Sequence, residues 1–211
     1  MFVIFLILLA VSLPVSFSMA LSTLIALKIG NYPGEVFSNM VIEGVKSYIL
    51  LAIPFFILAG NLMNSTGITQ RIFDFASALV GHIRGGLAQV NIMASVIFAG
   101  ISGTAVGDQA GLGAVEVKAM TEKGYSRSYS ASITLASSVI GAIIPPSVSL
   151  IVYAFLSEVS VARLFVAGII PGLLIAVVLM LHVNYTVKRG LVQAPSEESF
   201  DIRSLWTTLK K

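Results

Sequence analysis

Two interruptions in long apolar runs carry the residues that could bind a small ion. The first, ISGTAVGDQAGLG, contains Asp108, the one acidic residue deep in an apolar run. The second, IGAIIPPSVS, stops a helix because Pro146 has no backbone N–H and Pro145 restricts the residue before it. Hydroxyls, a carboxylate and freed carbonyls are the hard oxygen ligands that suit Na⁺. The candidate sodium- or substrate-binding residues are Ser102, Gly103, Thr104, Gly107, Asp108, Ser137, Ser138, Gly141, Pro145, Pro146 and Ser147.

The composition places these interruptions in a membrane protein. Hydrophobic residues make up 56% of the 211 residues and charged residues only 11%, whereas a soluble domain averages about 25% charged. Basic residues outnumber acidic ones, 13 to 10, but they lie at the ends of apolar runs, which argues against nucleic-acid binding. The chain has no cysteine, so we expect neither thiolate chemistry nor a cysteine metal site, and no metal beyond sodium.

Apolar runs of about 20 residues can each cross a bilayer, and they organise the chain. We predict an all-α membrane protein with about five transmembrane helices, an interfacial amphipathic helix, one re-entrant helical hairpin and one proline-broken helix. The predicted segments are a first transmembrane helix at 1–28, an interfacial helix at 33–46, two transmembrane helices in 47–84, the hairpin at 85–118, the broken transmembrane helix at 129–157, a transmembrane helix at 162–187 and a cytoplasmic tail or inter-repeat linker at 188–211. The first run lacks a basic start, which favours a retained span over a signal peptide.

The path of residues 87–117 is set by charge. Two crossings need about 40 residues, so this shorter stretch either crosses once or enters and leaves on the same side. Cytoplasmic loops collect Lys and Arg. A re-entrant path leaves only Arg71 and Arg163 outside, roughly eleven basic residues to two, against roughly nine to four for one crossing. We therefore predict the re-entrant path, with the N-terminus outside.

Both interruptions could also serve the structure alone, without binding an ion. Small residues in membrane helices more often form packing surfaces than ligand sites, and a proline pair more often marks a kink. Asp108 could bind an ion directly or fix the hairpin tip by pairing with backbone N–H groups, and the sequence leaves both roles open. Two such breaks in one chain favour a secondary transporter, because irregular backbone at membrane depth must line a cavity or be buried in protein.

Three strings carry a family resemblance. FAGISGTAVGDQAGLGAVEVKAM, KGYSRSYSASITLASSVIGAIIPPSVSLIVYAF and LFVAGIIPGLL resemble consecutive segments of the large membrane subunit of TRAP transporters, the tripartite ATP-independent periplasmic uptake systems of bacteria and archaea. The resemblance runs from Phe2 to the tail. It implies a DctM-like, elevator-type permease with two inverted hairpin-bearing repeats, of which this chain resembles the first. It also implies one sodium site formed by the tip at 102–108 and the break at 141–147, with substrate nearby.

The resemblance also implies partners and a location. We expect a small TRAP membrane subunit, a periplasmic substrate-binding protein and the missing second half of the large subunit, in the cytoplasmic or inner membrane of a bacterium or archaeon. Na⁺ would drive uptake of organic acids such as C4-dicarboxylates or sialic acid, with no other cofactor. Gly107 and Glu116 depart from the small aliphatic or apolar residues expected there. A truncated chain, a broken gene and a split subunit all stay open.

Two rival functions remain. Gly100-Ile101-Ser102-Gly103 matches the G-x-S-G pattern of rhomboid-type intramembrane serine proteases, with His182 as a candidate base. That short glycine-rich motif is weak, and a base must lie within hydrogen-bonding reach of its nucleophile. A passive ion channel is the other rival, but selectivity filters usually arise from symmetric repeats around an axis. We therefore expect a transporter and no enzymatic activity.

Overall fold

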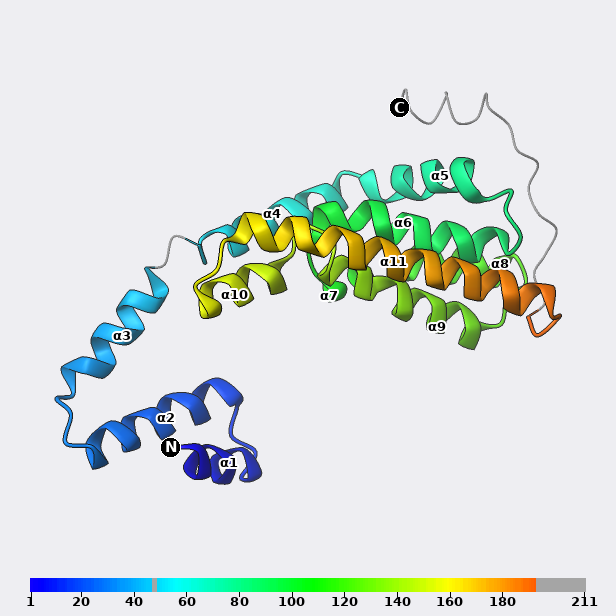
Figure 1. The fold of residues 1–211 in the computed structure, drawn as a ribbon. Helices are drawn as coiled ribbons and strands as arrows, with labels where there is room; N and C mark the ends of the chain where they lie inside the picture. Colours follow the sequence, from blue (N-terminus) through cyan, green and yellow to red (C-terminus); the bar gives the residue numbers. More distant parts are fainter. Residues whose placement is uncertain (47–48, 193–211) are drawn as a thin grey trace. The chain divides into compact units, whose positions relative to one another are not determined.

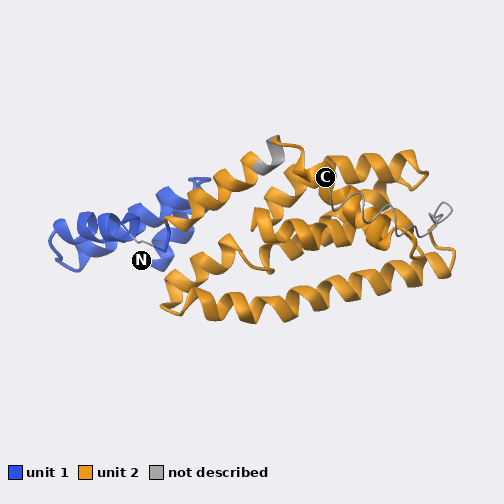
Figure 2. Cartoon of the chain, turned by 90° about the horizontal axis from the view of Figure 1, so that it is seen from above, with its two compact units in different colours: residues 1–50 blue, residues 51–211 orange. Residues whose placement is uncertain are grey.

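The chain is helical throughout the residues that the computed structural model describes, 1–46 and 49–192, with only the backbone described at 63–65. It divides into two compact units, residues 1–50 and 51–211, coloured separately in Figure 2. Within the described residues there is no β-strand, as the all-α prediction requires. Most of the predicted tail at 188–211, from residue 193 onwards, lies outside the described residues.

Unit 1 holds three helices, α1 (Phe2–Ala10), α2 (Val15–Ile29) and α3 (Glu35–Val45) (Figure 1). The single helix predicted for 1–28 is two helices in the structure. Ser12 has a left-handed φ of 64°, and Pro14 precedes the first turn of α2 because a proline cannot continue a helix begun before it. Helices α1 and α2 contact each other. Helix α3 falls within the segment predicted to lie in the interface.

Unit 2 begins with α4 (Ala52–Ser65) and α5 (Ile68–Val80), joined at Gly67, which has a φ of 77°. Helix α5 is amphipathic and lies along α6 (Gly86–Ser102). Its buried face repeats at helical spacing and packs on buried residues of α6 and of the segment after it. This cluster consists of Ile72, Phe73, Ala76, Val80, Val90, Ala94, Phe98 and Leu112.

Helix α6 is the central element of unit 2. It contacts α4, α5, α9 (Arg127–Ser138) and α11 (Val161–Lys188), which surround it in Figure 1. After Ser102 the chain reverses through the short α7 (Ala105–Asp108), a π-helical turn (Gln109–Gly113) and α8 (Ala114–Glu122). The chain therefore turns back on itself here, and we call this segment, with α6 as its first arm and α8 as its second, the hairpin.

The proline break is also present. Helix α9 tightens into a 3₁₀ turn at Val139–Ala142 and stops, and α10 (Val148–Ser157) begins after the two prolines. In the described part of the chain, α11 with 28 residues is the one helix long and apolar enough to cross a membrane by itself. The shorter apolar helices are Val15–Ile29, Ala52–Leu62, Gly86–Ser102 and Val148–Ser157. Breaks at Pro14 and at the proline pair divide two of the five spans that we predicted.

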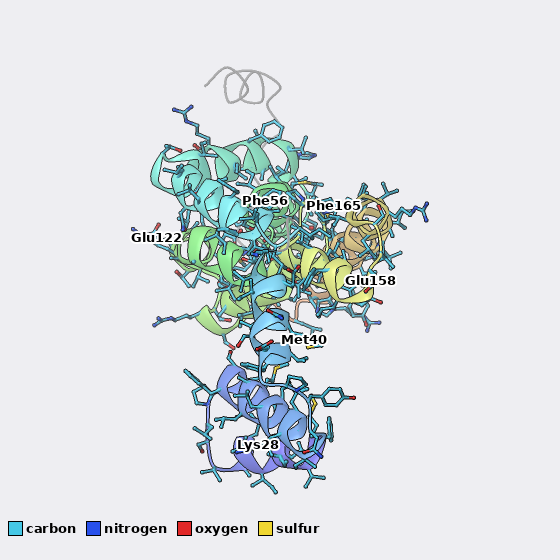
Figure 3. The ribbon with its side chains drawn as sticks, turned by 90° about the vertical axis from the view of Figure 1, so that its left-hand side faces the viewer. Lys28, Met40, Phe56, Glu122, Glu158 and Phe165 are labelled. Carbon is cyan, nitrogen blue, oxygen red and sulfur yellow. The ribbon has the colours of Figure 1, made fainter. Side chains whose placement is uncertain are left out.

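The start of the first arm, α6, and the end of the second arm, α8, lie at the same end of unit 2. Tyr125, after α8, donates a hydrogen bond from its hydroxyl to the Gly85 carbonyl before α6 at 2.7 Å. Val183 and Val187, near the end of α11, also lie against Gly85. Basic residues gather in these three adjoining segments: Arg84, Lys123, Arg127, Lys188 and Arg189. Glu158, labelled in Figure 3, lies just before the start of α11. The 28 residues of α11 span about 40 Å and separate Glu158 from the basic residues at the other end of that helix.

Candidate functional site

The hairpin tip is a tight turn that depends on glycine. Gly103 has a φ of 61°, and a Cβ atom built there would lie 2.6 Å from the Pro146 carbonyl oxygen. Thr104 caps α7 by accepting a hydrogen bond from the Gly107 N–H at 2.8 Å. The Ser102 hydroxyl donates to the Thr104 carbonyl at 3.4 Å. The tip therefore brings two hydroxyls and several backbone groups into a few residues.

The break after α9 is held by its own cap. The Ser147 hydroxyl accepts from the Leu150 N–H at 3.2 Å and donates to the Ala142 carbonyl at 2.6 Å. It thereby closes the gap between the end of the 3₁₀ turn and the start of α10. Two glycines of α11 approach the same gap, since a Cβ at Gly168 would lie 2.5 Å from the Ile143 carbonyl oxygen. A Cβ atom at Gly172 would meet the side chain of Ile144.

The tip and the break contact each other, although about 40 residues of chain separate them. The Val148 N–H, the first of α10, donates to the Gly103 carbonyl at 2.9 Å. A Cβ built at Gly141 would lie 3.2 Å from the Thr104 carbonyl oxygen and 3.6 Å from the Asp108 Cβ. Larger residues would hold the two segments apart, so the glycines permit the contact.

Asp108 lies in this contact with an unsatisfied oxygen. The residue is 2% exposed, and its Oδ1 atom has no hydrogen-bond partner among the described residues. A buried carboxylate is costly unless a charge or hydrogen bonds compensate it. The Thr104 carbonyl oxygen and the Asp108 Cβ atom both lie close to Gly141, so a carboxylate and a carbonyl, two ligand types that hard cations prefer, come from one small region.

The predicted serines of α9 face different ways. The Ser138 hydroxyl donates to the Leu135 carbonyl of its own helix at 2.9 Å, so it plays a local role in the structure. Ser137 instead faces α6, where its hydroxyl donates to the Asn91 Oδ1 at 2.8 Å and accepts from Ser95 at 3.1 Å. Of the two, only Ser137 joins a network between helices.

The sequence interpretation missed the α6 side of this network. Asn91 donates from Nδ2 to the Thr134 hydroxyl at 2.6 Å, and both side chains are buried. Gln109, in the second arm of the hairpin, donates to the Thr134 carbonyl at 2.6 Å. Asn91 and Ser95 interrupt the apolar run of α6, and a polar residue at such a position is a signal that could have identified them.

Helix α4 supplies a wall that the sequence interpretation also left out. A cavity of about 90 Å³ adjoins the tip, large enough for an ion with some water. Its α4 lining is Phe56, Ile57, Gly60 and Asn61, and its hairpin lining is Phe98, Ser102, Thr104, Gly107 and Ala110. Figure 3 labels Phe56 among these side chains. The cavity places the tip hydroxyls beside an open space.

The protease alternative does not fit the geometry. Ser102 ends α6, whereas Val183, next to His182, packs against Gly85 just before α6 begins. The 17 residues of α6 span about 25 Å, so His182 lies far beyond hydrogen-bonding reach of Ser102. The G-x-S-G match is explained by the turn itself, in which Gly103 adopts a left-handed φ.

Comparison with known proteins identifies the family. The family model for the tripartite ATP-independent periplasmic transporter, DctM component, matches residues 2–211. The sialic acid TRAP transporter large permease protein SiaM of Vibrio cholerae is 46% identical over 191 residues, 89% of this chain and 44% of that protein. The C4-dicarboxylate TRAP transporter large permease protein DctM of Pseudomonas aeruginosa is 44% identical over 147 residues, 70% of this chain and 34% of that protein.

A third relative also matches most of this chain. The sialic acid TRAP transporter permease protein SiaT of Haemophilus influenzae is 42% identical over 195 residues, 91% of this chain and 32% of that protein. The chain thus spans about a third to a half of the length of these relatives. The family match covers nearly all of the chain, including the hairpin and the break. The chain belongs to the DctM family of TRAP transporter large permeases.

Proposed function

We propose that this chain forms the first, hairpin-bearing part of a large TRAP permease that couples Na⁺ to the uptake of an organic acid. The observation that carries this proposal is the contact between the hairpin tip and the proline break. Broken helices whose freed backbone groups line a cavity are typical of the ion and substrate sites of secondary transporters. A sialic acid or a C4-dicarboxylate is the substrate class favoured by the names of its relatives.

The residues that would hold Na⁺ belong to both segments. Asp108 would contribute the carboxylate oxygen that has no partner among the described residues, and Thr104 and Gly141 would contribute backbone oxygen. Bound Na⁺ would supply the positive charge that compensates the buried carboxylate. Because Gly103 already binds the first N–H of α10, an ion held by both segments would fix the tip against the break. Bound sodium would therefore favour the closed arrangement of the tip and the break.

The partners and the location follow from the family. We propose that the chain acts with the rest of a large permease, a small membrane subunit and a periplasmic substrate-binding protein. The assembly would lie in the cytoplasmic membrane of a bacterium or archaeon, with the N-terminus of this chain outside. The hairpin would enter and leave the bilayer on the cytoplasmic side, which is supported by the basic residues gathered near both of its arms.

Replacing Asp108 tests the proposal. The chain would be joined to the remaining residues of the Vibrio cholerae SiaM relative and reconstituted in vesicles with a small subunit and a binding protein. We expect saturable, sodium-dependent uptake of sialic acid. In Asp108→Asn, the sodium concentration for half-maximal uptake should rise roughly tenfold to a hundredfold, because a hydrogen bond or contact to a charged group contributes about 1.5–3 kcal/mol.

Two controls make this experiment decisive. Ser130→Ala removes a buried hydroxyl on α9 that donates only to its own helix, so it should leave the sodium dependence unchanged. Wild-type uptake that neither saturates nor needs sodium would support a passive channel instead. Unchanged sodium dependence in Asp108→Asn would contradict the proposed ion site.

A further inference from the structure

A line of buried hydrogen bonds joins α6 and α9, and Ser95, at one end of this line, lies beside Asp108. Ser95 donates to Ser137 at 3.1 Å, Ser137 donates to the Asn91 Oδ1 at 2.8 Å, and the Asn91 Nδ2 donates to Thr134 at 2.6 Å. Ser95, Ser137 and Asn91 are 0% exposed and Thr134 is 2% exposed. Water in bulk therefore cannot replace these partners, and each proton must be directed within the network.

The direction of the protons follows from the chemistry of the groups. An amide oxygen can only accept, so the bond between Asn91 Oδ1 and Ser137 uses the hydroxyl proton of Ser137. The oxygen of Ser137 is then left to accept a proton from Ser95. The orientation of Asn91 is set in turn because its amide group donates to Thr134. The Thr134 carbonyl, at 3.1 Å, is a second acceptor for the Ser137 proton, but Asn91 Oδ1 at 2.8 Å is the closer one. Asn91 therefore favours the arrangement in which Ser137 accepts from Ser95.

Ser95 has one proton and two acceptors within reach. Its hydroxyl donates to Ser137 at 3.1 Å, and it also lies within hydrogen-bonding reach of the Asp108 carboxyl. A hydroxyl can donate to only one of these acceptors at a time. When nothing else compensates Asp108, donation to the carboxylate is the stronger bond, because hydrogen bonds to charged groups are stronger than neutral ones. A cation at Asp108 removes that preference.

We propose that Ser95 is a further residue of the ion site, whose hydroxyl donates to Asp108 without a cation and to Ser137 when a cation is bound. In the second state, the lone pairs of Ser95 are free to face the cation. Asn91 is a positioning residue, which acts through Ser137 by keeping an acceptor ready for the proton of Ser95. This inference deepens the proposed sodium site and rests on it.

Sodium binding to the reconstituted assembly tests the inference, measured without substrate as the rise in melting temperature with sodium concentration. We expect Ser95→Ala to raise the sodium concentration for half-maximal stabilisation about tenfold, since it removes one cation partner. Asn91→Ala should weaken binding in the same direction. The double variant should be no weaker than Ser95→Ala, because Asn91 acts only through the proton of Ser95.

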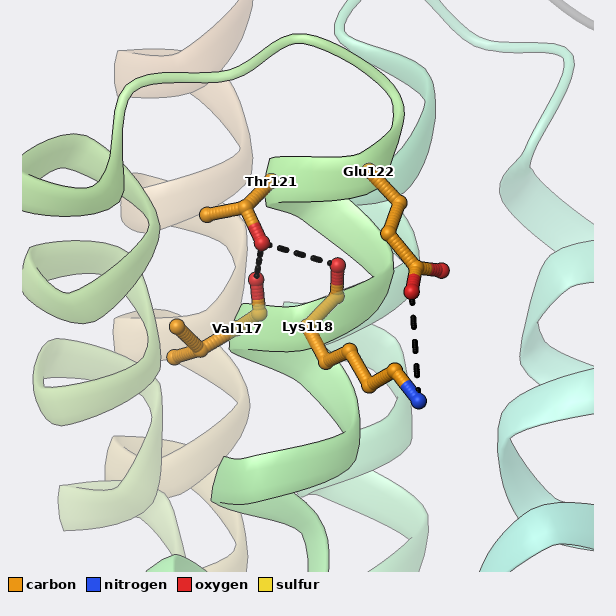
Figure 4. A network of polar contacts seen from close by, with 4 residues as sticks. All are labelled: Val117, Lys118, Thr121 and Glu122. Atoms are coloured by element: carbon orange, nitrogen blue, oxygen red, sulfur yellow. Dashed lines mark hydrogen bonds and ion pairs between the residues drawn. The ribbon is translucent and has the colours of Figure 1, made fainter.

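Two other hydroxyls provide matched controls. Thr121, on the second arm of the hairpin, donates only to the Val117 and Lys118 carbonyls of its own helix, at 2.8 and 2.9 Å (Figure 4). Ser130 on α9 likewise donates to the Ser126 carbonyl. Thr121→Val and Ser130→Ala should therefore bind sodium as wild type does. If either control weakens sodium binding as much as Ser95→Ala, the effect is general destabilisation and the inference fails.

The outcomes separate this inference from the proposed function. No stabilisation of the wild-type assembly by sodium, with potassium as the comparison salt, would defeat the proposed sodium site itself. A wild-type response that is retained unchanged in Ser95→Ala would leave the site standing and overturn the role of Ser95. Additive losses in the double variant would show that Asn91 acts separately from Ser95, and would overturn its positioning role.

Discussion

At the scale of single residues, glycine decides whether the two breaks can meet. Gly103 has a left-handed φ and lies against the Pro146 carbonyl, while Gly141 lies against the Thr104 carbonyl. Left-handed backbone costs an ordinary residue roughly 1–2 kcal/mol, and a Cβ atom in a filled space adds to that cost. The glycines of the interruptions are therefore required by contact as well as by flexibility.

Gly103→Ala should destabilise the protein more than a matched glycine substitution elsewhere. Gly124 also has a positive φ, of 98°, but a Cβ there would meet nothing within 4 Å. The two substitutions share the backbone cost, so their difference reports the contact with the break. We expect the free energy of unfolding of Gly103→Ala to be about 1–3 kcal/mol lower than that of Gly124→Ala. Denaturant unfolding of the purified chain in detergent measures both. Equal losses would mean that the tip is not packed against Pro146.

The sequence singled out hydroxyls, glycines and Asp108 because oxygen-rich residues are costly within an apolar run. The structure brings Gly103, Thr104, Asp108 and Gly141 together, and their role in binding sodium stays a prediction. The orientation of Ser138 toward its own helix could not be predicted, since both neighbouring serines have the same local sequence signal. Asn91 and Ser95 lie outside the two interruptions, and their partners Thr134 and Ser137 come from a helix about 40 residues later, so no local sequence signal joins them.

At the scale of helices, the break depends on α11 as well as on its prolines. The two prolines explain why α9 cannot continue into α10. They do not explain what packs against the backbone that the break exposes. In the structure, Gly168 of α11 lies against the Ile143 carbonyl. The sequence indicated the break and its position, but the supporting helix became visible only in the structure.

Gly168→Ala should reverse the usual effect of adding a methyl group to a helix. Alanine normally stabilises an exposed helix by up to about 1 kcal/mol relative to glycine. Gly44 in α3 has nothing within 4 Å of its Cβ position, so Gly44→Ala should be neutral or stabilising. A Cβ at Gly168 would lie 2.5 Å from a backbone oxygen, so Gly168→Ala should lower the melting temperature. A melting temperature raised by both substitutions would show that α11 does not support the break.

Helix boundaries show the limit of sequence reasoning at this scale. The segment 85–118, predicted as a hairpin from its length and glycine content, covers α6, α7, the π-helical turn and the first half of α8, which continues to Glu122. The predicted first helix is divided, and Pro14 was the available signal. The length of the apolar run predicts one helix, but a proline inside a helix costs about 3 kcal/mol, and Pro14 divides the run.

At the scale of unit 2, one end of the bundle is basic. Arg84, Lys123 and Lys188 come from three chain segments that adjoin one another around Gly85. A membrane protein keeps such residues on the cytoplasmic side. Because both arms of the hairpin reach this end, the arrangement supports a hairpin that returns to the side it came from. The basic residues, and not the fold or the spacing of apolar residues, therefore indicate which end faces the cytoplasm.

Single-cysteine labelling should place these loops on one side of the membrane. The chain has no cysteine of its own, so each introduced thiol reports only its own position. We expect Lys123→Cys and Lys188→Cys to react with an impermeant maleimide only from the cytoplasmic side of inverted vesicles. Glu158→Cys, before the start of α11, should react only from the opposite side. Reaction of Lys123→Cys and Lys188→Cys from opposite sides would contradict the hairpin path.

The most direct test concerns the meeting of the tip and the break within the membrane. Thr104 and Ser147 flank the hydrogen bond between Gly103 and Val148, so cysteines at both positions should lie within reach of a short bismaleimide. We expect Thr104→Cys with Ser147→Cys to form an intramolecular cross-link in the reconstituted assembly, and sodium to speed the reaction by holding the tip against the break. Cysteines that never cross-link and that react from opposite sides of the membrane would contradict the shared ion site.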